Sequence, residues 1–273
     1  MLKDINSLNK EEIKKFEDFV NSPYFNKYET VKKLFYYLKD KYPKITSEYV
    51  SKINLSVIIY GEKTFNSEKI RKLESDFNKL FEKFLLVEET EKKKCANEIF
   101  LLSVLRERRL IESFRKKINV IKSFKKKDFG TEVDYYLNRH KCYNQFHFDP
   151  DIKNFRQKII YCRDKLDYLS YYSTLMFLVY NMNYSRIKVY DKKGLRPPFN
   201  LINSIIEFVE KNKEHFSRFH PIIMLYYYSY LIFSKNDIRD FNHLQKYFND
   251  NKKKFDYTLS RYYYEISEGF LND

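Results

Sequence analysis

The sequence is poor in glycine and proline, with four glycines and six prolines among its 273 residues. Tight β-turns depend on glycine, and an open parallel sheet needs many short connections, so both are disfavoured. The four glycines are isolated, and neither nucleotide-binding motif, G-x-G-x-x-G or G-x-x-x-x-G-K, is present. We therefore predict an all-α protein without a cofactor.

Cysteine and long apolar runs are also scarce. The cysteines Cys95, Cys142 and Cys162 are an odd number at scattered positions, which argues against a disulfide framework. No run of about 18 apolar residues occurs, and Met1 is followed by a polar segment rather than by the apolar core of a secretory signal. We expect a cytoplasmic protein with reduced thiols and no membrane contact.

Tryptophan is absent, yet tyrosine and phenylalanine make up 19% of the chain. Such rings could stack on nucleic-acid bases, but a coding sequence rich in A and T enriches the same residues, and we favour that explanation. The net charge is +15, with 18 basic against 16 acidic residues in 1–92, 13 against 6 in 93–140, 11 against 5 in 141–199 and 10 against 10 in 200–273. The basic middle could attract nucleic acid, anionic lipid or an acidic protein.

The longest uninterrupted helical pattern covers residues 152–186, which contain neither glycine nor proline. One set of its residues recurs at steps of three and four: Ile159, Cys162, Leu166, Leu169, Ser173 and Met176. This spacing predicts the inward face of a buried central helix, with Leu166 in the core. Beyond Tyr168 the pattern is apolar nearly all round, so neighbouring helices should enclose that part.

Residues 1–92 are predicted to form an N-terminal helical unit of four helices. The first carries Ile13, Phe16, Phe19 and Val20, the next two cover residues 29–41 and 46–60, and the fourth begins after the Asn66 cap. Pro23, Pro43 and Gly61 separate these helices, because the residue before a proline avoids the helical region and glycine favours a helix end.

Residues 93–273 are predicted to form a second region, built of paired helices. These are expected at residues 96–105, 110–126, 132–146, 152–186, 200–216, 221–233, 238–255 and 257–270, with a loop at 191–198. Aligning Tyr228 with Tyr263 gives an offset of 35, near the period of about 34 residues in tetratricopeptide units. Tyr, Phe and Leu occupy the positions of the usual small residues. We therefore predict a degenerate tetratricopeptide-like α-solenoid, which ends either in a terminal cap or as a shortened chain.

Several segments resemble an uncharacterised family of bacterial helical proteins. They are SPYFNKYETVKKLFYYLKDKYP, SEKIRKLESDFNKLFEKFL, LLSVLRERRL and IIYCRDKLDYLSYY. Members of that family usually begin with a segment around SPYFN and continue into tetratricopeptide-like hairpins, and the likeness runs along nearly all of this chain. The resemblance implies a helical-repeat fold. It implies no activity, since the family has none assigned.

No constellation of catalytic or metal-binding residues is recognisable. His140, Cys142 and His147, with Cys162, are the most metal-like group, but residues two apart on a helix point away from each other. The carboxylate pairs Glu11–Glu12 and Glu88–Glu89 are adjacent on exposed helix faces, where no enclosed site tunes their pKa. We predict a protein that is not an enzyme and holds no metal.

Basic residues are concentrated where a hairpin between two helices is expected. They are Arg106, Arg108, Arg109, Arg115, Lys116, Lys117, Lys122, Lys125, Lys126 and Lys127. Arginine at this density can hold phosphates, so the first six are candidate contacts to nucleic acid or to an acidic partner. The alternative is an ordinary solvated helix surface, and we favour it.

The order of helices in residues 29–90 is similar to that of a winged helix, whose third helix enters the DNA major groove. Lys69, Arg71 and Lys72 would then be the candidate DNA contacts. Three observations argue against DNA binding here. The net charge of the region is small, the acidic residues Glu74 and Asp76 lie in the same helix, and no β-hairpin wing is recognisable.

These observations favour a non-enzymatic helical-repeat scaffold that presents surfaces to a macromolecular partner, most often a protein. The alternatives are a transcription-regulator-like protein that binds DNA through a winged-helix-like N-terminus, and an RNA-binding protein that uses the basic middle. The sequence assigns no oligomeric state.

Overall fold

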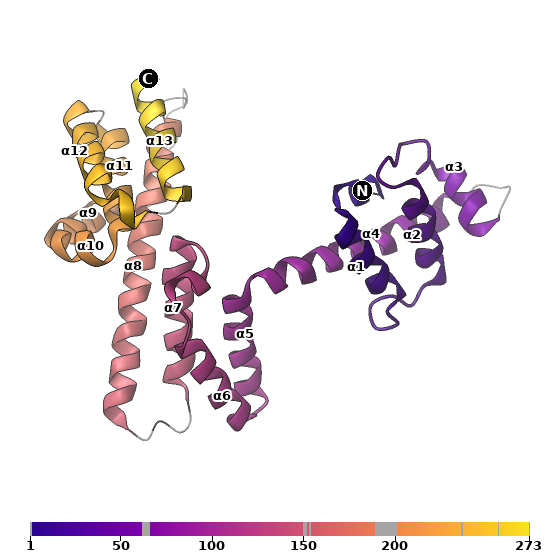
Figure 1. Cartoon of the computed structure of the whole chain (residues 1–273), viewed down its shortest axis with the longest axis horizontal. Helices are drawn as coiled ribbons and strands as arrows, with labels where there is room; N and C mark the ends of the chain where they lie inside the picture. The colour runs from indigo at the N-terminus through magenta and orange to yellow at the C-terminus, as the bar shows by residue number, and fades with distance from the viewer. Residues whose placement is uncertain are drawn as a thin grey trace. The chain divides into compact units, whose positions relative to one another are not determined.

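The computed structural model describes residues 2–61, 66–149, 152, 154–188, 201–235, 237–255 and 257–272. Every regular element in these ranges is a helix, and they contain no strand, so the all-α class is confirmed. The chain divides into two compact units, which we call unit 1 (Met1–Lys94) and unit 2 (Cys95–Asp273). Each is described by itself below, and Figure 1 labels their helices.

Unit 1 contains three long helices and several short ones. They are η1 (Leu2–Ser7), α1 (Lys10–Asn21), α2 (Glu29–Lys41), α3 (Lys52–Leu55), η2 (Ser56–Tyr60) and α4 (Ser67–Lys92). The helix predicted at residues 46–60 is shorter than expected, since regular structure begins only at Lys52. Its last turn, η2, ends at Gly61, whose φ of 67° lies in the left-handed region that glycine adopts without strain.

The core of unit 1 is built around Phe16 on α1, which is fully buried. Four rings from α2 and α4 surround it with centroid distances of 5.0 to 5.8 Å: Phe35, Phe77, Phe81 and Phe84. The apolar faces of the three long helices therefore meet at Phe16.

Unit 2 contains nine α-helices among its described residues. They are α5 (Lys94–Glu107), α6 (Ile111–Lys122), α7 (Glu132–His147), α8 (Phe155–Lys188), α9 (Ile202–Lys211), α10 (Lys213–Phe219), α11 (Pro221–Lys235), α12 (Ile238–Asn251) and α13 (Tyr257–Asn272), with the 3-10 turns η3 (Lys126–Phe129) and η4 (Lys252–Lys254). The helix predicted at residues 200–216 is two helices, α9 and α10, that break at Asn212. The predicted loop at residues 191–198 lies outside the described residues.

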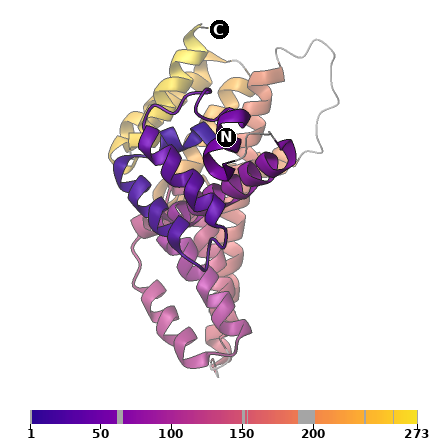
Figure 2. The same ribbon diagram turned by 90° about the vertical axis from the view of Figure 1, so that its right-hand side faces the viewer.

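The long helix α8 is the element on which unit 2 is assembled. It packs along α7 in its first half and against α11 further on, and α7 and α8 lie side by side in both ribbon views (Figures 1 and 2). The most enclosed helix is α11, whose residues Ile222, Ile223, Met224 and Leu225 are consecutive and all buried. Burial on every side, which we predicted for the second half of α8, is therefore most complete on α11.

The predicted inward face of α8 was wrong. Ile159, Leu166 and Leu169 are 55, 54 and 40% exposed. The buried face is instead a second stripe at seven-residue steps, in which Tyr161, Leu175 and Met182 are buried and Tyr168 is half-buried. Helical periodicity cannot choose between two such stripes, and the tyrosines bring more ring area into the contact with α7.

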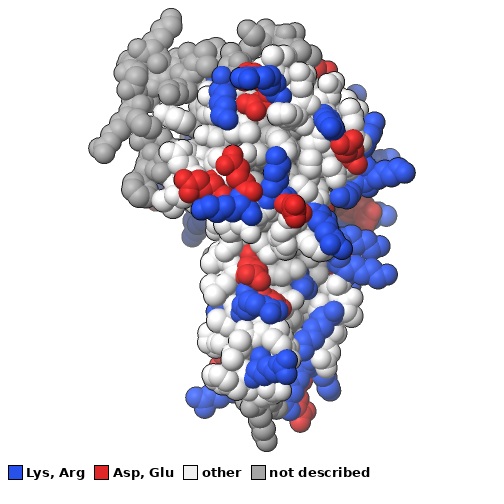
Figure 3. Space-filling model, turned by 90° about the vertical axis from the view of Figure 1, so that its left-hand side faces the viewer, with Lys and Arg blue, Asp and Glu red and all other residues white. Residues whose placement is uncertain are grey.

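The first half of α8 therefore has a row of apolar side chains that is exposed to solvent. Phe155, which precedes the predicted set at the same spacing, is 74% exposed, and the Cys162 side chain is half-buried. We call Phe155, Ile159, Cys162, Leu166 and Leu169 the α8 stripe. Figure 3 views the molecule from the side on which α8 lies in Figure 1, and uncharged surface extends there between charged groups.

Candidate functional site

The predicted basic site lies at the end of α5, in the turn that follows and on α6. Arg108, Arg109, Arg115 and Lys116 are exposed. Arg109 lies in the turn with a φ of 58°, in the left-handed region. The other two candidates make contacts inside unit 2. The Arg106 guanidinium lies 4.9 Å from the centre of the Phe148 ring, and the Lys117 amine forms an ion pair with Glu98 of α5.

Further along the run, the side chains of Lys122 and Lys126 also contact residues of unit 2. The Lys122 amine lies 5.6 and 5.7 Å from the ring centres of Phe146 and Tyr161. Lys126 forms an ion pair of 2.7 Å with Glu132. Lys122, Lys125, Lys126 and Lys127 are nevertheless exposed, so the exposed part of the basic run extends from the turn after α5 along α6 to η3.

The alternative DNA contacts Lys69, Arg71 and Lys72 are all exposed in the first two turns of α4. The Lys69 amine lies 5.8 Å from the centre of the Tyr60 ring. Carboxylates share the surface, because a shallow hollow beside Arg71 and Lys72 is also lined by Glu68 and Asp76. The described residues of unit 1 contain no strand that could form a wing.

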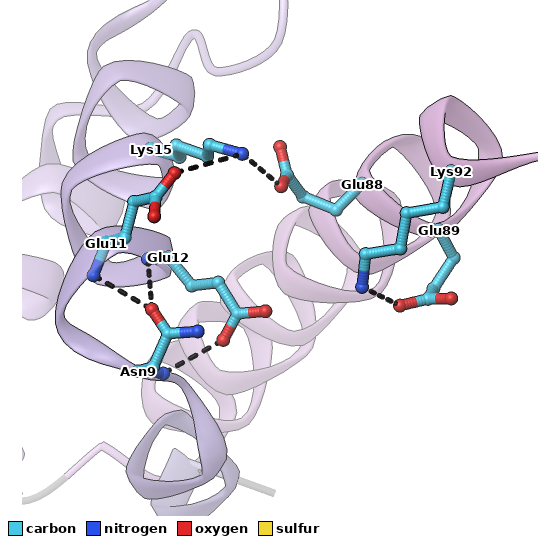
Figure 4. Close-up of polar contacts among 7 residues, drawn as sticks. All are labelled: Asn9, Glu11, Glu12, Lys15, Glu88, Glu89 and Lys92. Carbon is cyan, nitrogen blue, oxygen red and sulfur yellow. Dashed lines mark hydrogen bonds and ion pairs between the residues drawn. The ribbon is translucent and has the colours of Figure 1, made fainter.

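The adjacent carboxylate pairs of unit 1 stabilise helix ends and join two helices (Figure 4). The Asn9 side chain accepts hydrogen bonds of 2.9 Å from the N–H groups of Glu11 and Glu12, and Glu12 accepts one of 2.9 Å from the Asn9 N–H in return. Lys15 on α1 donates to Glu88 on α4 over 2.8 Å. Each acid shown thus has a structural partner.

The most distinctive hollow of unit 2 was missed by sequence reasoning. It has a volume of about 450 Å³ and lies among α7, α8 and the end of α10. Its lining is aromatic and acidic: Tyr135, Tyr143, Asp164, Asp167, Tyr168, Tyr171, His215, Phe219 and His220. The α8 members follow one helical face at steps of three, one and three, a signal that the sequence does contain.

Hydrogen bonds between rings fix the walls of this hollow. The Tyr136 hydroxyl lies 3.2 Å from His220 Nδ1, and the Tyr171 hydroxyl lies 3.2 Å from His215 Nε2. Burial, together with the neighbouring His215, lowers the pKa of His220 to about 4. His220 is therefore neutral at pH 7 and can accept or donate a hydrogen bond but carries no charge.

An arginine stacks behind the tyrosines of the hollow. The Arg139 guanidinium lies 4.7 Å from the ring centre of Tyr143 and 5.1 Å from that of Tyr168. These two rings are themselves stacked, with centroids 5.6 Å apart. Phenols, a neutral imidazole and two carboxylates thus face one open space, which gives it several hydrogen-bonding groups and no excess of positive charge.

Two members of the group that looks most like metal ligands in the sequence, Cys142 and His140, have other contacts in the structure. Cys142 is fully buried, and its hydrogen bond with Cys95 and its burial raise the pKa of its thiol. His140 Nδ1 lies 3.0 Å from the carbonyl oxygen of Lys165. Within the described ranges, no group of three or more His, Cys, Asp or Glu residues could hold a metal ion.

The basic and acidic residues in the first half of α8 lie on different sides of the helix. At about 100° per residue, Arg156 and Arg163 lie on one flank of the α8 stripe and Lys158 and Lys165 on the other. The acids of this part of the helix, Asp164 and Asp167, line the tyrosine–histidine hollow instead. An apolar row with basic edges is therefore exposed on the side of α8 turned away from that hollow.

Comparison with protein-family models, with curated proteins and with solved structures found no match. The likeness to the SPYFN-type bacterial family stays a prediction. Of the helices in the described ranges, none has the combination of length and apolar character that crossing a bilayer requires.

Proposed function

We propose that this chain is a non-enzymatic, cytoplasmic helical protein that binds another protein through the α8 stripe. The exposure of the stripe supports the proposal, since Phe155, Ile159, Leu166 and Leu169 are 40 to 74% exposed in one row. Apolar rows of this kind are anchors of protein interfaces. Covering them takes apolar surface out of contact with water, which is favourable by about 25 cal/mol per Å².

We further propose that the end of unit 2 is a degenerate tetratricopeptide-like repeat. Tyr228 and Leu231 on α11 align with Tyr263 and Ile266 on α13, and all four side chains are buried. Helix α12 packs against α11 as the second helix of a repeat pairs with the first. Stacked helix pairs present extended surfaces to partners without a catalytic cleft, which fits the proposed binding role.

The test of the proposed function is affinity capture of the tagged full chain from its own cells, with and without nuclease. Leu166→Glu places a charge in the α8 stripe. The control is Phe100→Glu, which changes an exposed apolar residue of α5. We expect the wild-type chain to capture a partner protein whether or not nuclease is added. Leu166→Glu should abolish this capture, and Phe100→Glu should leave it unchanged. Equal capture by all three chains would overturn the proposal.

A second candidate function is nucleic-acid binding, favoured by the exposed Arg108 and Arg109 at the turn after α5 and the exposed Lys116 on α6. Phosphate contacts would make affinity for mixed RNA or DNA fall steeply with salt, and changing these three residues to Glu would remove it. If the N-terminal helices bind DNA instead, changes at Lys69, Arg71 and Lys72 should act more strongly, and most on one preferred duplex, since base contacts carry sequence information.

A further inference from the structure

The spacing of the α8 stripe is that of a coiled-coil seam. From Phe155 to Leu169 its members are separated by four, three, four and three residues. This is a mean period of about 3.5 residues, which keeps a row of side chains facing a second helix along its length. The row extends over about 21 Å, at a rise of about 1.5 Å per residue. It therefore offers five successive positions to one partner helix.

The edges of the stripe have one sign of charge. In a coiled coil the residues that flank the seam select the partner by their charge. Here those positions hold Arg156 and Arg163 on one edge and Lys158 and Lys165 on the other. Arg163 Nη2 also lies 3.1 Å from Asp164, but Arg163 is 67% exposed, and such surface pairs between neighbours contribute little.

We propose that the α8 stripe binds an acidic amphipathic helix of a partner protein. This inference rests on the proposed function, since it specifies the chemistry of the partner. Leucine- or isoleucine-type residues of the partner would pack between Ile159, Leu166 and Leu169. Its Asp and Glu residues would lie along both basic edges, where opposite charges steer association and fix the register.

A second copy of this chain fits the stripe poorly. In an antiparallel pair centred on the stripe, Arg163 would face Arg163 of the other copy, and Lys165 would face its equivalent. A parallel pair would set Lys158 beside Arg163. Like charges at an interface cost several kcal/mol, so the same residues that attract an acidic helix oppose self-association.

A membrane surface is also a poorer fit. Helices that lie in a bilayer interface present a broad apolar face, whereas a row confined to seam positions is narrow. The flank beside Arg163 holds the hydroxyl of Ser170, which is exposed. The geometry thus matches one helix and not an extended apolar layer.

The test uses two synthetic peptides of about three heptads, with leucine and isoleucine at the seam. One has glutamate and the other lysine at every flanking position. Fluorescence anisotropy with the full chain, at about 0.15 M salt, should show at least about tenfold tighter binding of the glutamate peptide. Leu166→Glu should abolish that binding, and Phe100→Glu should leave it unchanged. Circular dichroism checks that both variants remain helical.

Charge reversal makes the test specific. The double variant Arg156→Glu, Lys158→Glu changes one residue on each edge, in the first turn of α8, where acidic residues are compatible with the helix dipole. It should weaken binding of the glutamate peptide and strengthen that of the lysine peptide. Equal binding of the two peptides by every chain, or binding of neither, would overturn the acidic-helix proposal.

Two further outcomes would assign the stripe to another occupant and also overturn the proposal. One is self-association of the chain, seen in sedimentation equilibrium and lost with Leu166→Glu. The other is Leu166-dependent binding to phosphatidylserine vesicles in place of the peptide. If a captured protein depends on Leu166 while neither peptide binds, the proposed function stands and only the acidic chemistry fails. If capture does not depend on Leu166, the proposed function itself fails.

Discussion

The two longest helices of the described chain, α4 and α8, differ in how many of their apolar stripes are buried. All six buried residues of α4 lie on one stripe, which packs into the core of unit 1: Ile70, Leu73, Phe77, Leu80, Phe81 and Phe84. Helix α8 carries two stripes, and packing within unit 2 buries only the one that contains Tyr161 and Leu175. A single stripe is covered when the unit folds, whereas a second stripe on the same helix remains exposed to solvent.

The largest effect should come from the centre of the one-stripe core. Phe16→Ala removes a fully buried ring that contacts four others, and should lower the stability of unit 1 by about 3 to 5 kcal/mol. Hydrogen exchange of the α1 and α4 amides measures this loss for unit 1 alone. A loss of less than about 1 kcal/mol would show that the ring cluster is not the core of the unit.

On α8, the covered stripe should show the next largest effect. Leu175 is fully buried, and Leu175→Ala should destabilise unit 2 by about 2 to 5 kcal/mol, because it leaves a cavity among α8 and its neighbours. Urea unfolding monitored in unit 2 measures the change. A small effect here would mean that the two faces of α8 are assigned the wrong way round.

The hollow against the covered side of α8 should give unit 2 a pH dependence. The pKa of His220 is lowered to about 4 in the folded chain, from an ordinary value of 6.5, so the unfolded chain binds more protons between these values. Stability is therefore complete above about pH 6.5 and falls as the pH drops toward 4. The full difference corresponds to about 3 kcal/mol, and solvent at the half-buried ring reduces this to about 1 to 2 kcal/mol.

The measurement is urea unfolding of unit 2 at pH 7, 5.5 and 4, in the wild type and in His220→Gln. Glutamine does not titrate, so the variant should lose less stability over this range even if it is weaker at pH 7. Parallel curves for the two chains would contradict the role of His220.

A smaller effect is expected at the start of α1 in unit 1. Asn9→Ala removes the side-chain oxygen that accepts from Glu11 and Glu12 (Figure 4), and should cost about 1 kcal/mol. Asn9→Ser is the matched control, because serine also caps helices and should recover most of the loss. An alanine variant as stable as the wild type would show that solvent replaces the cap.

Much of unit 1 was predictable because each of its long helices has only one apolar face. The predicted stripe on α1, which consists of Ile13, Phe16, Phe19 and Val20, is buried in the structure. In α8 the same reasoning located the helix but reversed its faces. Local periodicity records which residues share a face, while burial is decided by α7 and α11, which lie elsewhere in the sequence.

The tyrosine–histidine hollow could not be predicted for a related reason. The hydrogen bond between Tyr136 and His220 joins residues 84 apart in the chain, and that between Tyr171 and His215 joins residues 44 apart. The sequence shows Asp164, Asp167 and Tyr171 on one face of a helix but gives no sign that the end of α10 closes over them. The exposed arginines of the α5–α6 turn were predictable from the sequence, whereas the internal contacts of Arg106 and Lys117 were not.

The smallest expected effect lies on the exposed stripe of α8 and tests the comparison most directly. Leu166 is 54% exposed, so Leu166→Ala should change the stability of unit 2 by no more than about 0.5 kcal/mol. The sequence alone predicted that Leu166 is a core residue, whose replacement would be costly. Leu175→Ala makes the same chemical change two and a half turns further along the same helix and serves as its control. If both substitutions cost several kcal/mol in the isolated chain, the stripe is already covered and no face of α8 is left for a partner. If Leu166→Ala leaves stability unchanged but weakens partner capture, the stripe serves binding and not folding.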